Sequence, residues 1–170
     1  MEGNITIREA RIDDAARLLE VIPRIDAETD FLIRAPGEFK LTLEEEQKFI
    51  QSMVDDKKCL FLVALYGDTI VGTLGFKGNS LTRYQHTGEF GMGVLKEYWG
   101  FGIGSKLLEG LLDWAMASGI HKINLKVVAS NTRAMSLYEK FGFELEGRLK
   151  DSVKIENEYC DLIIMGKITG

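Results

Sequence analysis

The 170-residue chain has little of what metal centres, disulfide scaffolds and membrane spans require. It contains two cysteines, Cys59 and Cys160, and two histidines, His86 and His121, and none of them stands at the spacing of a metal-ligand motif. We therefore expect no metal site. No apolar run approaches the roughly 18 residues of a membrane span, and no basic-then-apolar segment leads the chain. These absences predict a cytoplasmic protein with no membrane partner.

The chain also has fewer basic than acidic residues. The chain has 21 Lys and Arg against 26 Asp and Glu, a formal net charge of −5 and a sequence pI near 5.2. Nucleic-acid binding needs clustered Lys and Arg to neutralise phosphates, so a nucleic-acid partner is not expected and a cationic partner fits better. With 45% hydrophobic residues, the length predicts a single domain over residues 1–170 with a sizeable core.

What the chain does have is a cluster of alternating glycines followed by an amphipathic pattern. The cluster and its flanks read Trp99, Gly100, Phe101, Gly102, Ile103, Gly104 and Ser105. Three positions without a Cβ let the backbone turn sharply and bring N–H groups close to an anion. Apolar residues from Leu107 to Ala115 then recur at helical spacing, which predicts a helix whose positive N-terminus faces the turn. The pattern predicts a pyrophosphate site, the alternative being a plain strand-to-helix turn.

Spacing excludes two other phosphate motifs. The dinucleotide fingerprint has the form G-x-G-x-x-G and needs an acid after the next strand, whereas here the glycines run G-x-G-x-G. The next expected strand, Ile123–Val128, is followed by Ala129, Ser130 and Asn131, so no acid is available for a ribose. A P-loop is excluded because the chain has no G-x-x-x-x-G-K-S/T.

The cluster resembles the pyrophosphate motif Q/R-x-x-G-x-G/A of the GNAT superfamily, whose members transfer acetyl groups from acetyl-coenzyme A (acetyl-CoA) to amines. Trp99 stands where Gln or Arg is usual, and the Tyr98-Trp99-Gly100 opening is similar to the branch that includes ribosomal-protein N-terminal acetyltransferases. The stretch from Asn131 to Tyr138, with Phe141–Phe143 after it, resembles the family's second motif. The resemblance spans nearly the whole chain and is weakest over residues 22–42.

The resemblance implies acetyl-CoA as co-substrate, and it implies an acceptor that is a small-molecule amine or a peptide N-terminus. Backbone N–H groups near Met92 and Val94 would pair with the pantetheine and polarise the thioester carbonyl. The remaining coenzyme contacts would come from the glycine turn, Ser105 and Asn131, although Asn131 could equally be a simple helix cap and Trp99 a packing residue. A homodimer is compatible with the sequence.

Two side chains are candidates for the proton transfers. The resemblance places Glu89, on the strand that feeds the glycine turn, where a carboxylate takes the proton of the amine; the alternative is a solvent-facing strand acid. Tyr138 would supply a proton or hydrogen bond to the departing thiolate, and the alternative is an ordinary half-buried tyrosine beside a buried stripe of Ala134, Leu137 and Phe141.

The order of the elements predicts a mixed α/β fold with a mostly antiparallel central sheet flanked by helices. Asp13 is expected to cap a first helix that Pro23 ends or kinks, and the third strand of a meander is expected over Arg83–Val94. Between them, residues 24–40 form a long lid-like excursion in which the acids Glu28, Asp30 and Glu38 could attract a cationic amine.

A different class of function remains open on the sequence alone. A coenzyme-A-binding module without transferase activity could keep the same glycine turn and act as a sensor. Such a module would be expected to lose Tyr138 or the carboxylate, and this chain has both.

Overall fold

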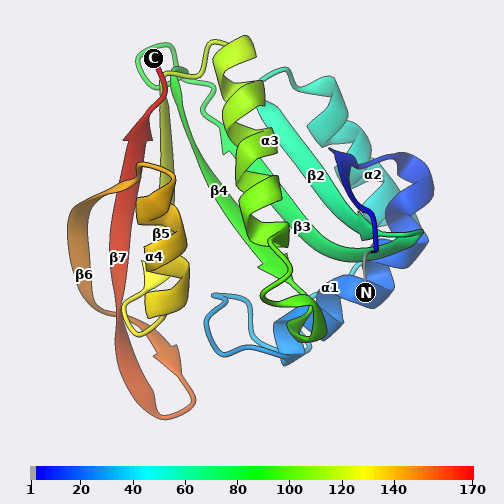
Figure 1. Ribbon diagram of the computed structural model, residues 1–170, viewed down its shortest axis with the longest axis horizontal. Coiled ribbons are helices and arrows are strands. Elements are labelled where there is room, and N and C mark those ends of the chain that lie inside the picture. The colour runs from blue at the N-terminus through cyan, green and yellow to red at the C-terminus, as the bar shows by residue number, and fades with distance from the viewer. Residues whose placement is uncertain (1–2) are drawn as a thin grey trace.

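The computed structural model describes residues 3–170, which form one seven-stranded sheet with helices on both faces (Figure 1). The strands are β1 (Ile5–Glu9), β2 (Cys59–Tyr66), β3 (Thr69–Gly78), β4 (Thr87–Val94), β5 (Lys122–Val128), β6 (Glu144–Ile155) and β7 (Glu158–Ile168). The helices are α1 (Ala15–Ala27), α2 (Leu43–Asp55), α3 (Ile103–Ala117) and α4 (Thr132–Lys140), with short 3-10 turns η1 (Ile12–Asp14) and η2 (Lys96–Tyr98).

The strands lie in the order β1-β2-β3-β4-β5-β7-β6, and all neighbours are antiparallel except β4 and β5. The predicted mixed α/β fold with a mostly antiparallel sheet is therefore confirmed. Within residues 3–170, no helix is long and apolar enough to cross a membrane.

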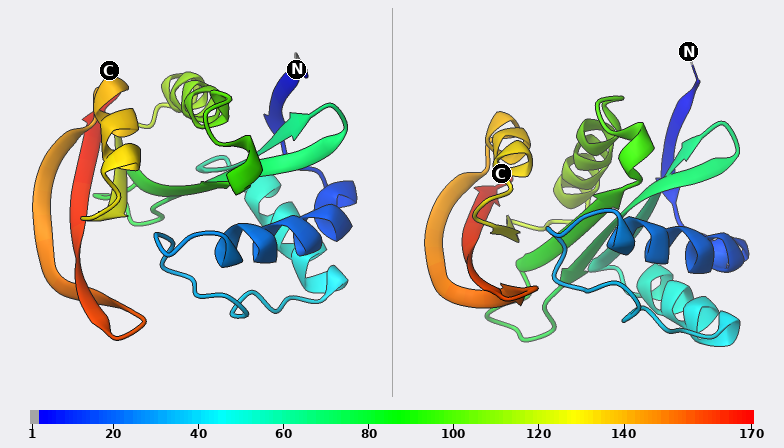
Figure 2. Two further views of the ribbon diagram at one scale, coloured as in Figure 1. Left: turned by 60° about the horizontal axis from the view of Figure 1, so that its bottom comes forward. Right: turned by 90° about the horizontal axis from the view of Figure 1, so that it is seen from below.

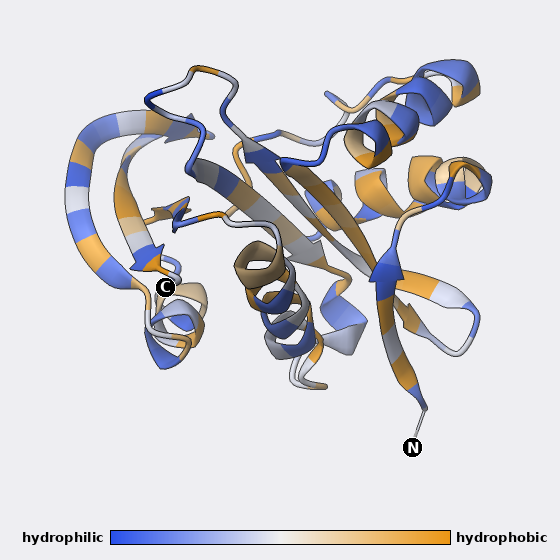
Figure 3. Ribbon diagram, turned by 90° about the horizontal axis from the view of Figure 1, so that it is seen from above, coloured by the Kyte–Doolittle hydropathy of each residue, from blue (hydrophilic) through white to orange (hydrophobic). Residues whose placement is uncertain are grey.

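The helices form two layers, with α3 and α4 on one face of the sheet and α1 and α2 on the other (Figure 2). β2 lies between the two layers, so its residues Cys59–Leu65 are all buried, and Figure 3 shows the central strands as an apolar layer. α3 buries one stripe of its surface against β1 to β4 because its apolar residues recur at helical spacing. The buried residues are Ile103, Leu107, Leu108, Leu111 and Ala115.

The start and end of α1 differ from the expectation. The N-terminal cap is Asp14 rather than Asp13, and its carboxylate accepts hydrogen bonds from Arg8, Arg17 and the backbone N–H of Arg11. Of the two expected effects of Pro23, an end or a kink, the first is wrong, because the helix continues past Pro23 to Ala27. Packing of buried residues on both sides of Pro23 offsets the one backbone hydrogen bond that a proline removes.

The third strand of the meander is shorter than expected. β4 begins at Thr87, because residues 81–86 form turns closed by hydrogen bonds from Tyr84 N to Leu81 O and from Thr87 N to Tyr84 O. The strand predicted over Ile123–Val128 is confirmed as β5, which begins one residue earlier at Lys122.

The feature that creates the site is the separation of β4 from β5. The two strands pair over three residues only, Thr87–Glu89 against Lys122–Asn124. Beyond Glu89, β4 is paired with β3 alone and β5 with β7 alone, and Figure 1 shows the two strands diverging toward their carboxyl ends. The divergence leaves an opening in the sheet beside the second half of β4.

Candidate functional site

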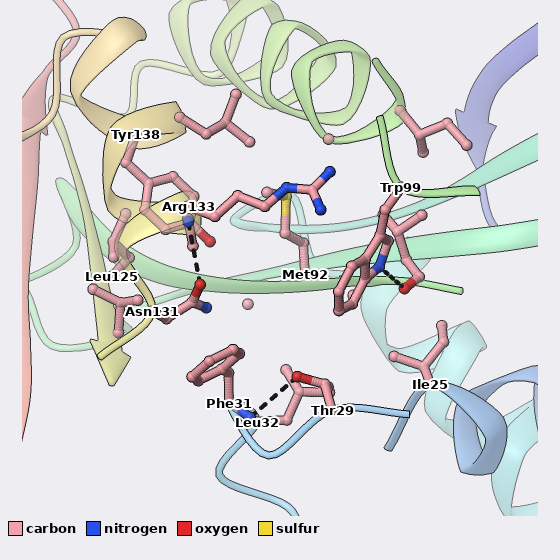
Figure 4. Close-up of a pocket in the computed structure, with 18 of the residues that line it drawn as sticks. Ile25, Thr29, Phe31, Leu32, Met92, Trp99, Leu125, Asn131, Arg133 and Tyr138 are labelled. Atoms are coloured by element: carbon pink, nitrogen blue, oxygen red, sulfur yellow. Dashed lines mark hydrogen bonds between the residues drawn. The ribbon is translucent and has the colours of Figure 1, made fainter. Parts of the chain in front are cut away.

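A cavity of about 800 Å³ occupies this opening; we call it the strand-gap cavity (Figure 4). Its walls come from segments that are distant in the sequence: β4, the glycine turn with the start of α3, the start of α4, β5, and residues 25–33. A cavity of this size suits an elongated ligand of several hundred daltons. The structure therefore brings the glycine turn and the second motif to one site.

The backbone of β4 faces this cavity with every second residue. The N–H of Leu95 donates to Val71 O on β3, which fixes the alternation of the antiparallel pair. Phe90, Met92 and Val94 consequently direct their N–H and C=O groups away from β3, toward the opening. This is the orientation that the predicted role of Met92 and Val94 requires.

The glycine turn presents the N-terminus of α3 to the cavity. Gly100 and Gly102 have positive φ angles of 85° and 78°, and a Cβ on either would meet no atom within 4 Å. Glycine is favoured here by the left-handed backbone, and it leaves free space in front of the first N–H groups of the helix. Gly104 differs, because a Cβ there would lie 3.1 Å from Leu137 Cδ2. It permits close packing of α3 on α4.

Trp99 supports a cation beside the glycine turn. Its Nε1 donates a 2.8 Å hydrogen bond to Val94 O, and the Arg133 guanidinium lies 5.2 Å from the ring centroid (Figure 4). Lys96 Nζ lies 5.9 Å from the same ring. The Trp99 side chain therefore packs and hydrogen-bonds to the backbone, while the positive charge comes from Arg133 on α4 and Lys96 on η2.

Of the residues predicted to bind coenzyme, Phe101 is the exception. Gly100, Gly102, Ile103, Gly104, Ser105 and Asn131 line the strand-gap cavity with Met92, Val94 and Trp99, whereas Phe101 is absent from its walls. The Phe101 ring packs instead on Tyr66 and Tyr98, away from the opening. Its place in the motif reflects packing of the turn.

Tyr138 reaches the cavity from α4, and it is more buried than expected. Its side chain is the buried one of the helix, at 8% exposure, while Ala134, Leu137 and Phe141 are half-buried. The ring packs edge-on against Phe90 and Phe143, and Figure 4 shows it extending from α4 into the cavity. Burial raises the pKa of the Tyr138 phenol to about 12, so the hydroxyl keeps its proton at neutral pH.

Asn131 and Glu89 lie at the rim. Asn131 Oδ1 accepts a 3.2 Å hydrogen bond from Ala134 N, so the residue does cap α4, and it also lines the cavity. The Glu89 side chain is half exposed, and its Oε2 lies 3.9 Å from Lys126 Nζ on β5. Along β4, Glu89 shares its face of the sheet with Gly91 and Gly93. That face carries α1 and α2.

A second cavity of about 530 Å³ lies on that face; we call it the helix-side cavity. Residues from α1, α2, the 32–41 segment and strands β2, β3 and β4 surround it. The two cavities share Gly91, Met92 and Gly93 of β4, together with Ile25, Leu32 and Ile33. The middle of β4 is therefore accessible from both sides.

Sequence reasoning missed several lining residues of the strand-gap cavity. Thr29, Phe31 and Leu32 come from the excursion after α1, where periodicity is weak and the sequence indicated only a lid-like loop. Two of the acids expected there accept backbone hydrogen bonds, Glu28 from Lys96 N and Glu38 from Ala35 N. Arg133 could have been predicted, because it is a cation five residues before Tyr138 within the second motif.

Comparison with known proteins identifies the family. The profile of the Acetyltransferase (GNAT) family matches residues 25–143, which is more than half of the chain. The chain belongs to this family. As a GNAT protein it is an acetyl-CoA-dependent acyltransferase, which confirms the resemblance noted in the motifs.

Two curated relatives are similar to the GNAT chain at 29% identity. One is an uncharacterized N-acetyltransferase p20 from Bacillus licheniformis, matched over 96 residues, which is 56% of this chain and 53% of that protein. The other is the L-amino acid N-acetyltransferase AaaT of Escherichia coli (strain K12), matched over 111 residues, 63% of this chain and 67% of that protein. The chain thus spans about half the length of the first relative.

Solved structures share the fold along the whole chain. A GNAT-family acetyltransferase from Streptococcus pneumoniae is 34% identical with a TM-score of 0.95, covering 98% of this chain and all of that one. A ribosomal-protein-alanine N-acetyltransferase from Brucella melitensis is 26% identical with a TM-score of 0.85, over 96% and 99% of the two chains. A Salmonella typhimurium protein solved with acetyl-CoA has a TM-score of 0.86 at 20% identity, over 98% and 94%.

Proposed function

We propose that the protein acetylates a primary amine by direct attack of the amine on acetyl-CoA, with both substrates bound together. The observation that supports this is the meeting of two cavities at Gly91–Gly93 on β4. One cavity has the shape and donors for the coenzyme, and the other opens on the opposite face. An amine in the helix-side cavity would reach a thioester in the strand-gap cavity through the gap beside β4.

The residues of the strand-gap cavity fit acetyl-CoA, which supplies an activated acetyl group as a thioester. The N-terminus of α3 and the cation of Arg133 would hold the pyrophosphate, since both are positive and lie beside the open space at Gly100 and Gly102. The N–H groups of Met92 and Val94 would hydrogen-bond the pantetheine arm and the acetyl carbonyl oxygen, where negative charge develops.

We assign removal of the acceptor's proton to Glu89 and stabilisation of the departing sulfur to Tyr138. The acceptor ammonium, with an ordinary pKa of about 10.4, must lose a proton before attack, at a cost on the order of 4 to 5 kcal/mol at pH 7. Glu89 lines the strand-gap cavity two residues before Gly91, where the two cavities meet, and would take this proton directly or through water. Tyr138, protonated at neutral pH, would donate a hydrogen bond to the departing thiolate.

An acyl-enzyme route has less support than direct attack. Neither cysteine lines either cavity, and burial raises the pKa of the Cys59 thiol, which makes it a poor nucleophile. Ser105 does line the strand-gap cavity, yet neither histidine of the described residues 3–170 lies on its walls to activate the hydroxyl.

The names of two relatives suggest which classes of acceptor to test first. The E. coli relative is named for L-amino acids and the B. melitensis structure for a ribosomal-protein alanine, so free amino acids and peptide N-termini are acceptors to test first, with small amines beside them. The experiment is acetyl-CoA consumption over this panel, with product mass measured. Direct attack predicts intersecting double-reciprocal lines when both substrates are varied. Tight coenzyme binding without turnover of any amine would favour the sensor module instead.

A further inference from the structure

The helix-side cavity contains a buried carboxyl group without a partner. Glu46 lies in the first turns of α2 and is 1% exposed, although it lines the cavity. Among the described residues 3–170, its two oxygens are the buried side-chain polar atoms that lack a hydrogen bond. An unpaired buried carboxyl costs stability, so its presence in a cavity wall calls for a ligand that would pair with it.

The neighbouring charges do not satisfy Glu46. Arg34 is the cation that acts on Glu46, but its Nε and Nη2 donate to the Asp26 carboxylate at 2.6 and 3.0 Å, and its guanidinium lies 4.9 Å from the centre of the Phe39 ring. Arg34 lowers the pKa of Glu46 less than burial raises it. The cavity is lined by three acids, Asp26, Glu38 and Glu46, and by two bases, Arg34 and Lys40, which leaves one acid in excess.

The floor between Glu46 and the reacting site is open and flat. Phe61 on β2, Gly75 on β3 and Gly91 on β4 are directly opposite one another in the strand registers. A Cβ at Gly75 or Gly91 would meet no atom within 4 Å. Because neighbouring strands are about 4.8 Å apart, Phe61 lies roughly 10 Å from Gly91 across the sheet, and α2, which carries Glu46, packs on β2.

We propose that Glu46 binds a second cationic group of the acceptor, so that the preferred substrates are molecules with two amines joined by an apolar chain. This inference rests on the proposed function. One amine would react at Gly91, and the other would pair with Glu46 two strands away. The rings of Phe39, Phe49 and Phe61 would pack on the methylene chain between them.

The physical reason for selectivity is the state of Glu46 when no cation is present. A bound ammonium supplies donors to both oxygens of a carboxylate that is shielded from bulk solvent, where an ion pair is strong. An acceptor with one amine leaves the carboxyl unpaired, as it is in the free protein. A site with a buried polar group discriminates strongly against a ligand that leaves this group unpaired. The discrimination is far larger than that of an apolar site against a ligand that lacks one methylene.

The test compares 1,5-diaminopentane with n-pentylamine, which has the same chain and one amine. For the wild-type protein we expect kcat/KM to favour the diamine by at least about 10-fold. Glu46→Gln should remove this preference by lowering kcat/KM for the diamine toward the value for pentylamine. Glu44→Gln is the matched control, because this carboxylate is exposed on the same turn and pairs only with Lys48; it should keep the preference.

Binding of the diamine to the coenzyme A complex, measured by calorimetry, gives a readout that needs no turnover. Wild-type protein should bind the diamine and Glu46→Gln should not. Equal rates for the two amines, or an unchanged preference in Glu46→Gln, would overturn the role of Glu46 while leaving acetyl transfer intact. Absence of turnover with every amine would contradict the proposed acetyl transfer. The calorimetric binding of the diamine would then test the role of Glu46 independently.

Stability separates a binding role from a structural one. Glu46→Met should raise the melting temperature of the free protein, because it removes an unpaired carboxyl and keeps an unbranched side chain of similar length. A large fall in melting temperature would show that Glu46 holds the fold together, and the binding proposal would be withdrawn.

Discussion

Trp99 Nε1 donates a 2.8 Å hydrogen bond to the carbonyl oxygen of Val94. This bond occupies the carbonyl of a residue at the cavity and leaves the Val94 N–H available. It also fixes the indole ring beneath the guanidinium of Arg133. At the position where the motif usually has Gln or Arg, the chain thus has a scaffold that orients a cation from another helix.

The first prediction concerns Arg133. Arg133→Gln should weaken coenzyme A binding by about 10-fold and reduce its dependence on salt, because a phosphate-facing charge is lost. Calorimetry at two ionic strengths measures both effects. Acetyl-pantetheine, which lacks the pyrophosphate, is the internal control and should bind the variant and the wild type equally. An equal loss with the truncated compound would place Arg133 elsewhere.

The second prediction concerns the glycine turn. Gly102→Ala should cost about 1 to 2 kcal/mol of stability, because the residue has a φ of 78° that an L side chain adopts at a penalty. Coenzyme A affinity should fall with it, since the turn positions the first N–H groups of α3. Gly75→Ala is the control, because that backbone is ordinary and its Cβ is free of contacts; it should leave coenzyme affinity and stability near wild type.

The fold and the position of the glycine turn could be predicted because their signals are local. Alternating glycines, a capped helix and strand-length apolar runs each depend on a few adjacent residues, and the glycine turn lies where they indicate. Even there the roles differ within the motif. Gly102 allows a left-handed backbone conformation, Gly104 allows close packing against Leu137, and Phe101 packs on Tyr98.

The rest depends on tertiary contacts that no local pattern contains. Tyr138 is more buried than its helix periodicity indicates, because its ring packs on Phe90 of β4 and on Phe143, which precedes β6. Glu46 reads as one of three consecutive glutamates at a helix start, which is typical of an exposed N-terminus. Only the packing of α1 and the 34–39 segment over α2 shows that this carboxyl is buried and Glu44 is not.

The third prediction concerns Tyr138. Tyr138→Phe should lower kcat by roughly 10- to 1,000-fold with little change in coenzyme affinity. Full proton transfer from a phenol of pKa about 12 to a thiolate of pKa about 8.5 would be uphill by about 5 kcal/mol, so a hydrogen bond to the sulfur is the expected contribution. Unchanged kcat in the variant would remove Tyr138 from the mechanism, and a loss of affinity alone would make it a packing residue.

The fourth prediction concerns Glu89. Glu89→Gln should depress kcat/KM most at neutral pH and recover in part at alkaline pH, where more of the acceptor amine is already deprotonated. The pH profile of kcat/KM measures this. Lys126→Met is the control for the neighbouring charge, 3.9 Å away, and should leave the shape of the profile unchanged. A profile of wild-type shape at reduced height would mean that Glu89 positions the acceptor.

The last prediction concerns the pH dependence of stability, to which Asp14 and Glu46 contribute with opposite sign. The hydrogen bond from Arg8 lowers the pKa of Asp14 to about 2, so the folded protein binds fewer protons there than the unfolded chain. Its contribution, about 2 kcal/mol, is present above pH 4 and is lost as the pH falls toward 2. The free energy of unfolding of Asp14→Asn should therefore be lower than that of the wild type at neutral pH and approach it in acid.

Burial raises the pKa of Glu46, so the folded protein holds that proton more tightly than the unfolded chain does. The wild-type protein should lose stability as the pH rises from the ordinary value of 4.5 toward the raised one, and Glu46→Met should lack this loss. Denaturant unfolding from pH 2 to 8 measures all three proteins. The gap between the Glu46→Met and wild-type curves should be constant below pH 4 and change above it, because the unfolded wild-type chain then releases the Glu46 proton while the folded protein keeps it. Parallel curves would show that the Glu46 carboxyl is solvated in the folded protein.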